Sequence, residues 1–469
     1  MQLQAGPTHA GWRSLLRREW MPTIVVLLGG VLLQSMNVLM LTTVLPSIVG
    51  ELSGVAMLSW PTSAFLASSI VATSCAGMLA GAIGARATYC LGVAIFGLGA
   101  LLCSVAGTMG WVVVGRLVQG FGGGLEAAAA YVALRATFPE AMWPRTIALM
   151  STSWSMSVLL GPLVGGMFAR FGNWRSAFVA TAIVAGILAV SAFVILPPGR
   201  SGRQMSAAEL PAGRIALICM AIAAMSSASI VASPLAKLGL IVCAIGALAA
   251  MLRIDRVAAA PLLPGDAFSL RTPTGMGLWL ALLLCITFSP LQIYVPLFLQ
   301  HLRGLDPLAA GFTVASGSLG WTIASIAAAN ATGQWPDRLM AAGPAIMGVS
   351  LLAIGLLVPS SAPTLVVVLA IVALGIGIGQ CWPFVAHRIM SGAKPGDEVV
   401  AASAVPTVQQ TGFALGAALA GVVANAHGFA GGVADSDMIQ EAFWVPASFV
   451  VPAVIACLAS ARLLGLRKA

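Results

Sequence analysis

Long apolar runs, separated by short polar segments, cover almost the whole chain. A transmembrane helix needs about 20 mostly apolar residues, and fourteen segments approach that length. They are expected at 22–46, 57–83, 87–107, 110–134, 144–169, 176–196, 213–233, 236–252, 274–299, 307–332, 340–358, 362–389, 399–426 and 441–464. The order is six segments, a shorter pair, then six more. This pattern predicts an all-α polytopic membrane protein with fourteen transmembrane helices, or twelve if the central pair does not span.

The grouping of the segments predicts the domain organisation. Two six-helix bundles, at 22–198 and 274–464, flank a linker at 199–273 that carries the central pair. Residues 1–21 and 465–469 form the terminal segments. Cytoplasmic loops are enriched in Lys and Arg, and most of these residues fall on one side when the N-terminus is placed inside. Both termini are therefore expected in the cytoplasm.

Composition points to lipid as the main solvent of the chain. Apolar residues make up 59% of the sequence and charged residues 8%, whereas a soluble domain carries about 25% charged residues. The net charge of +9 does not predict nucleic-acid binding, because the basic residues are scattered among short loops. The cysteines lack metal-ligand spacing and the histidines are dispersed. We expect no metal and no cofactor, and an integral-membrane enzyme is a remote alternative.

A weak internal repeat links the two groups of six segments. WVVVGRLVQGFGGG at 111–124 is similar to TLVVVLAIVALGIGIG at 364–379. The corresponding glycines, each pair 255 residues apart (375 − 120 = 255), are Gly120 and Gly375, Gly122 and Gly377, Gly124 and Gly379, Gly161 and Gly416, and Gly166 and Gly421. Parallel repeats of this kind build one large class of transporters, whose site lies at the midplane.

Three motifs carry a resemblance to a known family. GRLVQGFGGG at 115–124 is similar to R-x-x-Q-G-x-G, GPLVGG at 161–166 to the antiporter motif G-P-x-x-G-G, and Trp174-Arg175 to a W-R pair that opens the sixth span. The chain thus resembles the major facilitator superfamily, in particular its fourteen-helix drug:proton antiporter branch (EmrB/QacA type). The resemblance implies a secondary transporter in the bacterial cytoplasmic membrane, monomeric, which exports small lipophilic compounds, neutral or monocationic, by proton-coupled alternating access. The alternative is an exporter of one metabolite without proton coupling.

The sequence departs from the family pattern at two places. The segment 77–86, GMLAGAIGAR, has Gly81 where the family has Asp, although Arg86 fits. The second-half loop keeps Asp337 and Arg338, so the resemblance implies a cytoplasmic gate of Arg86, Asp337 and Arg338. A helix cap is an equal interpretation of Asp337. In the first span, Asn37 stands where the family often has an acid.

Two charged residues, Arg116 and Glu126, fall inside one apolar span. Glu126 is the only acid expected well inside a span. Such a carboxyl can bind a proton in one conformation and release it in another; a structural ion pair or hydrogen bond, or contact with a cationic substrate, are the alternatives. Arg116 lies ten residues earlier, about 15 Å along a helix and on another face. It therefore needs a partner on another helix, and Gln34, Ser35 and Asn37 of the first span are candidates. By resemblance, Arg116 assists proton coupling.

The remaining candidates are helix-packing and cavity residues. In the antiporter motif, Gly161, Gly165 and Gly166 allow close helix approach, and Pro162 allows a bend. By resemblance this bend helps to seal the outer end of the helix; a purely structural kink is the alternative. Polar and aromatic residues of the spans are expected to line a mostly neutral substrate cavity: Asn37, Ser68, Tyr131, Trp154, Gln292, Tyr294, Trp321, Gln380, Trp382, Gln409 and Gln410.

Overall fold

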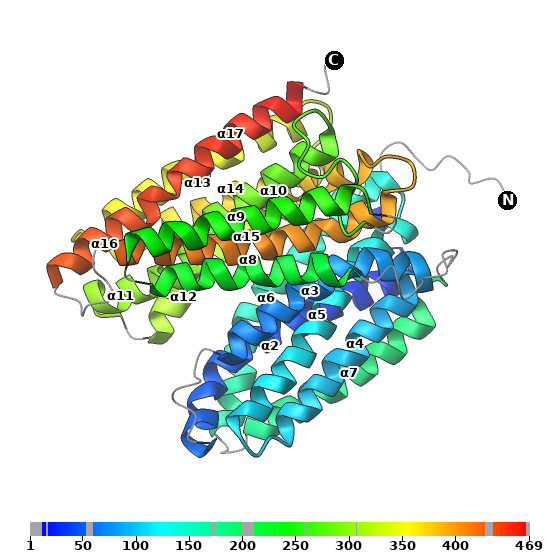
Figure 1. Cartoon of the computed structure of the whole chain (residues 1–469), viewed down its shortest axis with the longest axis horizontal. Helices are drawn as coiled ribbons and strands as arrows, with labels where there is room; N and C mark the ends of the chain where they lie inside the picture. The colour runs from blue at the N-terminus through cyan, green and yellow to red at the C-terminus, as the bar shows by residue number, and fades with distance from the viewer. Residues whose placement is uncertain are drawn as a thin grey trace. The chain divides into compact units, whose positions relative to one another are not determined.

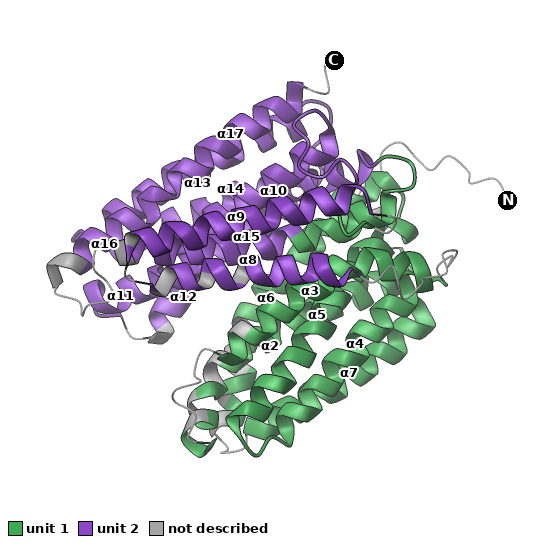
Figure 2. Ribbon diagram, viewed as in Figure 1, with its two compact units in different colours: residues 1–210, 259–264, 394–407 green, residues 211–258, 265–393, 408–469 purple. Residues whose placement is uncertain are grey.

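The computed structural model describes residues 12–15, 17–52, 60–170, 174–198, 211–231, 233–258, 261–305, 307–426 and 435–465. Within these ranges every regular element is helical (Figure 1). The helices fall into two compact units (Figure 2).

The first unit comprises residues 1–210, 259–264 and 394–407 (green in Figure 2). Its helices are α1 (Trp12–Leu15), α2 (Met21–Leu52), α3 (Trp60–Ile83), α4 (Ala85–Ser104), α5 (Met109–Thr137), the short 3-10 helix η2 (Glu140–Met142), α6 (Trp143–Arg170) and α7 (Trp174–Ile195). Within this unit α5 packs against α3 and α4, whereas α2 packs against α6. Because α5 lies between α3 and α4, its two intramembrane charged residues, Arg116 and Glu126, are buried.

The second unit comprises residues 211–258, 265–393 and 408–469 (purple in Figure 2). Its helices are α8 (Ala212–Ile230), α9 (Pro234–Arg256), α10 (Pro273–Ile293), α11 (Val295–Arg303), α12 (Pro307–Ala328), α13 (Trp335–Leu357), α14 (Thr364–Ser391), α16 (Asp435–Ser448) and α17 (Val450–Gly465). Helix α15 (Glu398–Ala426) contributes its residues up to Thr407 to the first unit and the rest to the second.

Each of the fourteen expected segments corresponds to one helix or to two consecutive helices. The two interrupted segments are 274–299, which breaks between α10 and α11, and 441–464, which breaks between α16 and α17. Proline removes a backbone hydrogen bond, and Pro290 and Pro446 lie in the helices just before these breaks. Eleven of the described helices are long and apolar enough to cross a membrane. The choice between fourteen and twelve spans stays a prediction.

The glycines of the internal repeat make the same close contacts in both units. A side chain at the first or third glycine of each set would collide with the backbone of the neighbouring helix. The colliding pairs are Gly120 with Phe65 and Gly124 with Ser69 between α5 and α3, and Gly375 with Gly317 and Gly379 with Trp321 between α14 and α12. The middle glycine faces the other side: Gly122 meets α4 and Gly377 meets α13. The repeat seen in the sequence is therefore a repeat of helix contacts.

The central pair, α8 and α9, belongs to the second unit. It forms a small apolar core that also packs against Leu415 and Ala418 of α15. Arg214 of α8 and Asp255 of α9 form a buried ion pair at 2.5 Å. Much of the rest of α9 exposes apolar side chains, among them Leu235, as suits a helix surrounded by lipid. The predicted domain boundaries at 198–199 and 273–274 stay a prediction.

Candidate functional site

The Glu126 carboxyl lies inside the first unit, in the middle of α5. Only 3% of the residue is exposed. It borders a small cavity of about 10 Å³, lined also by Gly30, Leu33, Gln34, Val93, Phe96 and Leu188. These residues come from α2, α4 and α7. The volume is near the minimum that holds one water molecule, and the Oε1 atom of Glu126 has no hydrogen-bond partner in the described structure.

The nearest polar neighbour of Glu126 is Tyr89 of α4. The Tyr89 hydroxyl donates to the backbone carbonyl of Val26 at 2.7 Å, and the same hydroxyl lies beside the Glu126 carboxyl. A side chain at Gly30 would collide with both Glu126 Oε1 and the Tyr89 hydroxyl. The three groups therefore meet at one point, where α2 can approach only because residue 30 is a glycine.

Arg116 lies ten residues before Glu126 on α5 and has a separate set of partners. Its Nη1 donates to Asn37 Oδ1 at 2.5 Å and to Gln119 Oε1 at 2.6 Å, and its Nε to the Pro61 carbonyl at 3.4 Å. The guanidinium lies over the Phe65 ring, 4.2 Å from its centre. The prediction of a first-span partner is confirmed, with Asn37 as that partner. Among the described residues no carboxylate forms an ion pair with Arg116, and Glu126 is not its partner.

The second unit has neutral residues at the two equivalent positions. The repeat offset of 255 places Ile371 opposite Arg116 (116 + 255 = 371) and Cys381 opposite Glu126 (126 + 255 = 381). Both residues are fully buried, and the Cys381 thiol donates to the Leu339 carbonyl at 3.4 Å. The packing of this helix therefore does not itself require either charge.

The expectation that Glu126 is the only well-buried acid is wrong. Glu441 of α16 is 1% exposed, and Asp255 and Asp266 are buried as well. Glu441 was expected at the first residue of its span. The helix begins earlier, at Asp435, so Glu441 lies about two turns inside the helix. It lies near Tyr294. Asp255 was expected in a loop, but α9 extends to Arg256, so Asp255 pairs with Arg214.

The predicted cavity residues divide between the units. Asn37, Ser68, Tyr131 and Trp154 lie in the first; Gln292, Tyr294, Trp321, Gln380, Trp382, Gln409 and Gln410 lie in the second. Asn37 is bound to Arg116, and Gln380 donates to the Leu339 carbonyl of α13 at 3.4 Å. Trp154 is 41% exposed. Contact with substrate stays a prediction for each of them.

Aromatic rings form a cluster in the second unit. Trp321 contacts Trp382 with ring centres 5.8 Å apart and Phe288 at 5.4 Å, and Phe288 contacts Phe413 at 6.4 Å. The Trp321 Nε1 is buried without a hydrogen-bond partner in the described structure. The sequence pointed to the tryptophans but not to the phenylalanines, which look like ordinary apolar residues of a span.

The three predicted gate residues have separate partners. Asp337 at the start of α13 pairs with Arg388 near the end of α14 at 2.8 Å. Arg338 lies over the Trp335 ring, and Arg86 lies over the Phe193 ring. Arg388 was missed, although a basic residue in the last turn of a helix is a recognisable sign. Both Asp337 interpretations stay open, because the residue lies in the first turn of α13 and also forms an ion pair.

The model of the Major Facilitator Superfamily matches residues 27–417. The chain belongs to this superfamily. It is 34% identical over 427 residues to a probable multidrug-efflux transporter of Mycobacterium tuberculosis, covering 88% of this chain and 89% of that protein. It is 26% identical over 429 residues to the tetracenomycin C resistance and export protein of Streptomyces glaucescens, covering 89% of this chain and 78% of that protein.

Solved facilitator structures have the same fold. The human organic anion transporter MFSD10 superposes with a TM-score of 0.70 at 13% identity, covering 95% of this chain and all of that one. The proton:xylose symporter XylE gives a TM-score of 0.65 at 15% identity, covering 93% of this chain and 94% of that one. The predicted facilitator fold is confirmed, and the protein is a multi-pass membrane transporter of small molecules rather than an enzyme.

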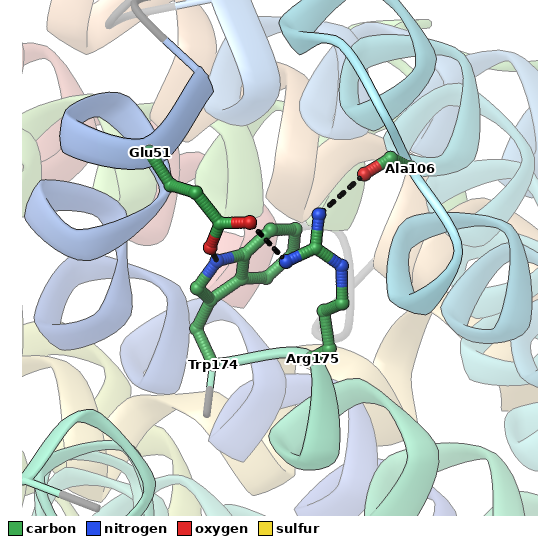
Figure 3. Close-up of polar contacts among 4 residues, drawn as sticks. All are labelled: Glu51, Ala106, Trp174 and Arg175. Atoms are coloured by element: carbon green, nitrogen blue, oxygen red, sulfur yellow. Dashed lines mark hydrogen bonds and ion pairs between the residues drawn. The ribbon is translucent and has the colours of Figure 1, made fainter. Parts of the chain in front are cut away.

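The W-R pair of this facilitator ties three helix ends together (Figure 3). Trp174 Nε1 donates to Glu51 Oε2 at 2.7 Å, Arg175 Nη1 contacts Glu51 Oε1 at 2.5 Å, and Arg175 Nη2 donates to the Ala106 carbonyl at 2.9 Å. The hydrogen bond from Arg175, and then that from Trp174, lower the pKa of Glu51 below its usual 4.5. We call Glu51, Trp174, Arg175 and Ala106 the end clamp, since it joins the end of α2, the residues after α4 and the start of α7.

The antiporter motif lies in α6, which the structure describes as one helix from Trp143 to Arg170. Gly161 and Gly165 are buried, and a side chain at Gly161 would meet Met36 and Met40 of α2. The surroundings of Pro162 and Gly166 within this helix lie outside what the structure describes. Close packing at Gly161 is confirmed, whereas sealing of the outer end stays a prediction.

Proposed function

We propose that this facilitator exports small lipophilic compounds, neutral or monocationic, in exchange for protons by alternating access. It acts as a monomer in the bacterial cytoplasmic membrane, with both termini in the cytoplasm. The single observation that carries the proposal is the Glu126 carboxyl, buried in a membrane helix without a cation beside it.

Burial decides the protonation state of this carboxyl. An isolated carboxylate is costly in an apolar interior, and the groups that face Glu126 are neutral: Tyr89 from α4, Gly30 and Gln34 from α2, and Leu188 from α7. Glu126 therefore carries a proton in this conformation. A second conformation that admits water to the small cavity would let the proton leave, and alternating between the two conformations carries protons across the membrane.

The asymmetry between the repeats supports a functional role for the charge. The equivalent helix of the second unit packs through the same glycines with Cys381 in the place of Glu126. Helix packing does not need this carboxyl, and burial in the membrane penalises it. A role in transport is therefore its best explanation. Other acids also lie within candidate spans. Asp255 is paired with Arg214, and Glu441, 1% exposed in α16, is the rival candidate for the coupling role.

Two observations support lipophilic substrates. The aromatic cluster of Trp321, Trp382, Phe288 and Phe413 offers flat apolar surfaces and one unpaired N–H donor, which suits planar organic compounds with a hydrogen-bond acceptor. The relatives at 34% and 26% identity are named for multidrug efflux and for export of tetracenomycin C. Intramembrane carboxyls are few, so highly charged cations fit poorly.

A second candidate function is export of one metabolite without proton coupling. The observation that favours it is Asn37, which occupies the place of the family acid and is bound to Arg116. A neutral amide there cannot exchange a proton.

Transport in proteoliposomes separates the two candidates. Purified protein is reconstituted, a pH gradient is imposed, and uptake of a panel of fluorescent lipophilic cations and neutral compounds is followed with and without an ionophore that collapses the gradient. Gradient-dependent accumulation of several compounds is the expected result. Transport of a single compound that ignores the gradient would overturn the proposal in favour of the second candidate.

A further inference from the structure

We propose that Tyr89 is a positioning residue that switches the proton affinity of Glu126, by moving its hydroxyl hydrogen between the Val26 carbonyl and the Glu126 carboxyl. The inference rests on the proposed proton coupling and deepens it. It assigns the moving part to α2, which carries Val26.

The hydrogen count at Tyr89 fixes the direction of each bond. A tyrosine hydroxyl has one hydrogen to donate and lone pairs to accept with. The Val26 carbonyl can only accept, so the 2.7 Å contact takes that hydrogen. Toward Glu126 the hydroxyl can then act only as an acceptor, and a carboxyl can donate to it only when protonated. This geometry therefore stabilises the protonated acid.

Displacement of α2 reverses the arrangement. Once the Val26 carbonyl is out of reach, the Tyr89 hydroxyl turns its hydrogen to the carboxyl. A carboxylate accepts such a hydrogen bond more strongly than a neutral acid does, so the charged form is now favoured. The proton of Glu126 passes to water on the side of the small cavity, where Oε1 and Gln34 lie. One proton leaves, and the hydrogen of Tyr89 stays on Tyr89.

The packing of the unit identifies α2 as the part able to shift. Helices α4 and α5 touch through backbone, because a side chain at Gly92 or Gly122 would collide with the main chain of the facing helix. Tyr89 and Glu126 therefore keep their relative places. By contrast, side chains hold α2: Arg116 joins it to α5 through Asn37, and the end clamp joins it to α7. Its most extensive packing is against α6, where the Ser35 and Ser157 hydroxyls are 2.5 Å apart and Ser153 donates to the Leu28 carbonyl at 3.1 Å.

Other titratable groups do not face Glu126 in the described structure. The cavity residues on α2, α4 and α7 are glycine, glutamine or apolar side chains. Cys90, next to Tyr89, directs its thiol to the Ala189 carbonyl of α7 at 3.7 Å. Arg116 lies about 15 Å along α5, where Asn37 and Gln119 accept its hydrogen bonds. Among the described residues, Tyr89 is thus the titratable side chain placed beside Glu126 to distinguish its two protonation states.

The test varies the pH on one face of the proteoliposome at a time and records the midpoint of the transport rate on each face. Wild-type protein is expected to show two different midpoints, one for proton loading and one for release. Tyr89→Phe removes both the acceptor and the donor, so the two midpoints approach each other by about one pH unit, a tenfold change in relative proton affinity. Cys90→Ala, one residue away and facing α7, is the matched control and keeps the wild-type midpoints.

A substitution that preserves shape guards against a folding defect. Fluorotyrosine at position 89 keeps the hydroxyl but makes it a stronger donor and a weaker acceptor, so both midpoints move to lower pH. Wild-type midpoints in both Tyr89→Phe and the fluorotyrosine protein would overturn the switch. If Glu126→Gln meanwhile abolishes the pH dependence, proton coupling through Glu126 stands without Tyr89. If Glu126→Gln retains the pH dependence, both the coupling role and the switch are wrong.

Discussion

Replacing Glu126 by glutamine tests proton coupling with little change of shape. Glutamine has nearly the same size as a protonated glutamic acid and cannot lose a proton. A pH difference of one unit supplies about 1.4 kcal/mol per proton, so an exchanger with one coupling carboxyl accumulates a neutral compound up to about tenfold per unit. Since Glu126 supplies that carboxyl in α5, the variant is expected to accumulate none, yet to retain downhill exchange of substrate.

The assay compares accumulation at pH gradients of zero, one and two units in reconstituted vesicles. Glu19→Gln makes the same chemical change at an exposed site, 60% accessible, and is expected to behave as wild type. Glu441→Gln makes it at another buried acid of a membrane helix. Gradient-driven accumulation in Glu126→Gln, together with its loss in Glu441→Gln, would refute the assignment and transfer the coupling role to α16.

Three further predictions concern packing and charge. Gly124→Ala should collide with the α3 backbone and destabilise the detergent-solubilised protein by about 1–3 kcal/mol, whereas Gly81→Ala, with open space around it, should leave the melting temperature unchanged; equal effects would contradict the close-packing argument. Glu51→Gln should have a lower melting temperature than wild type at pH 7, because the folded protein stabilises the charged form of Glu51. This difference in melting temperature should shrink as the pH falls below 4.5 and through the lowered pKa of Glu51. A difference that persists at low pH would show that the charge of Glu51 is not its cause. A double-mutant cycle of Asp337→Asn and Arg388→Gln should give a coupling of up to about 1 kcal/mol in thermal unfolding, and strictly additive effects would show that the ion pair is without energetic weight.

The helices and their pairing were largely accessible from the sequence. Apolar length located every segment, since lipid leaves few alternatives to a helix. The glycine register of GFGGG and GIGIG identified the repeat, because close helix approach selects for the smallest residue at fixed spacing. Helix ends were less accessible: α16 begins earlier than expected, and this moved Glu441 from the edge of a span into the interior.

The partners of the charged residues were accessible only in part. Spacing along one helix showed that Arg116 and Glu126 lie apart and that Arg116 needs a partner on another helix. The choice of Asn37 among the three first-span candidates depends on the rotation of α2. The surroundings of the Glu126 carboxyl depend on Tyr89 and Gly30, which belong to two other helices. A tyrosine in an apolar span gives no sign in the sequence of which carboxyl it faces.

The lone guanidinium of Arg116 has an electrical consequence. When Glu126 is protonated, the buried part of α5 carries the single positive charge of Arg116, and when Glu126 is ionised these two buried charges sum to zero; Arg135 lies in the last turn, at the helix end. Moving one charge through the full membrane potential involves about 2.3 kcal/mol per 100 mV. The two buried residues therefore make any conformational step that displaces α5 more voltage-sensitive with the proton bound than without it. Membrane potential would then act more strongly on the half of the transport cycle in which Glu126 is protonated, and the direction of net flux would depend on voltage as well as on pH.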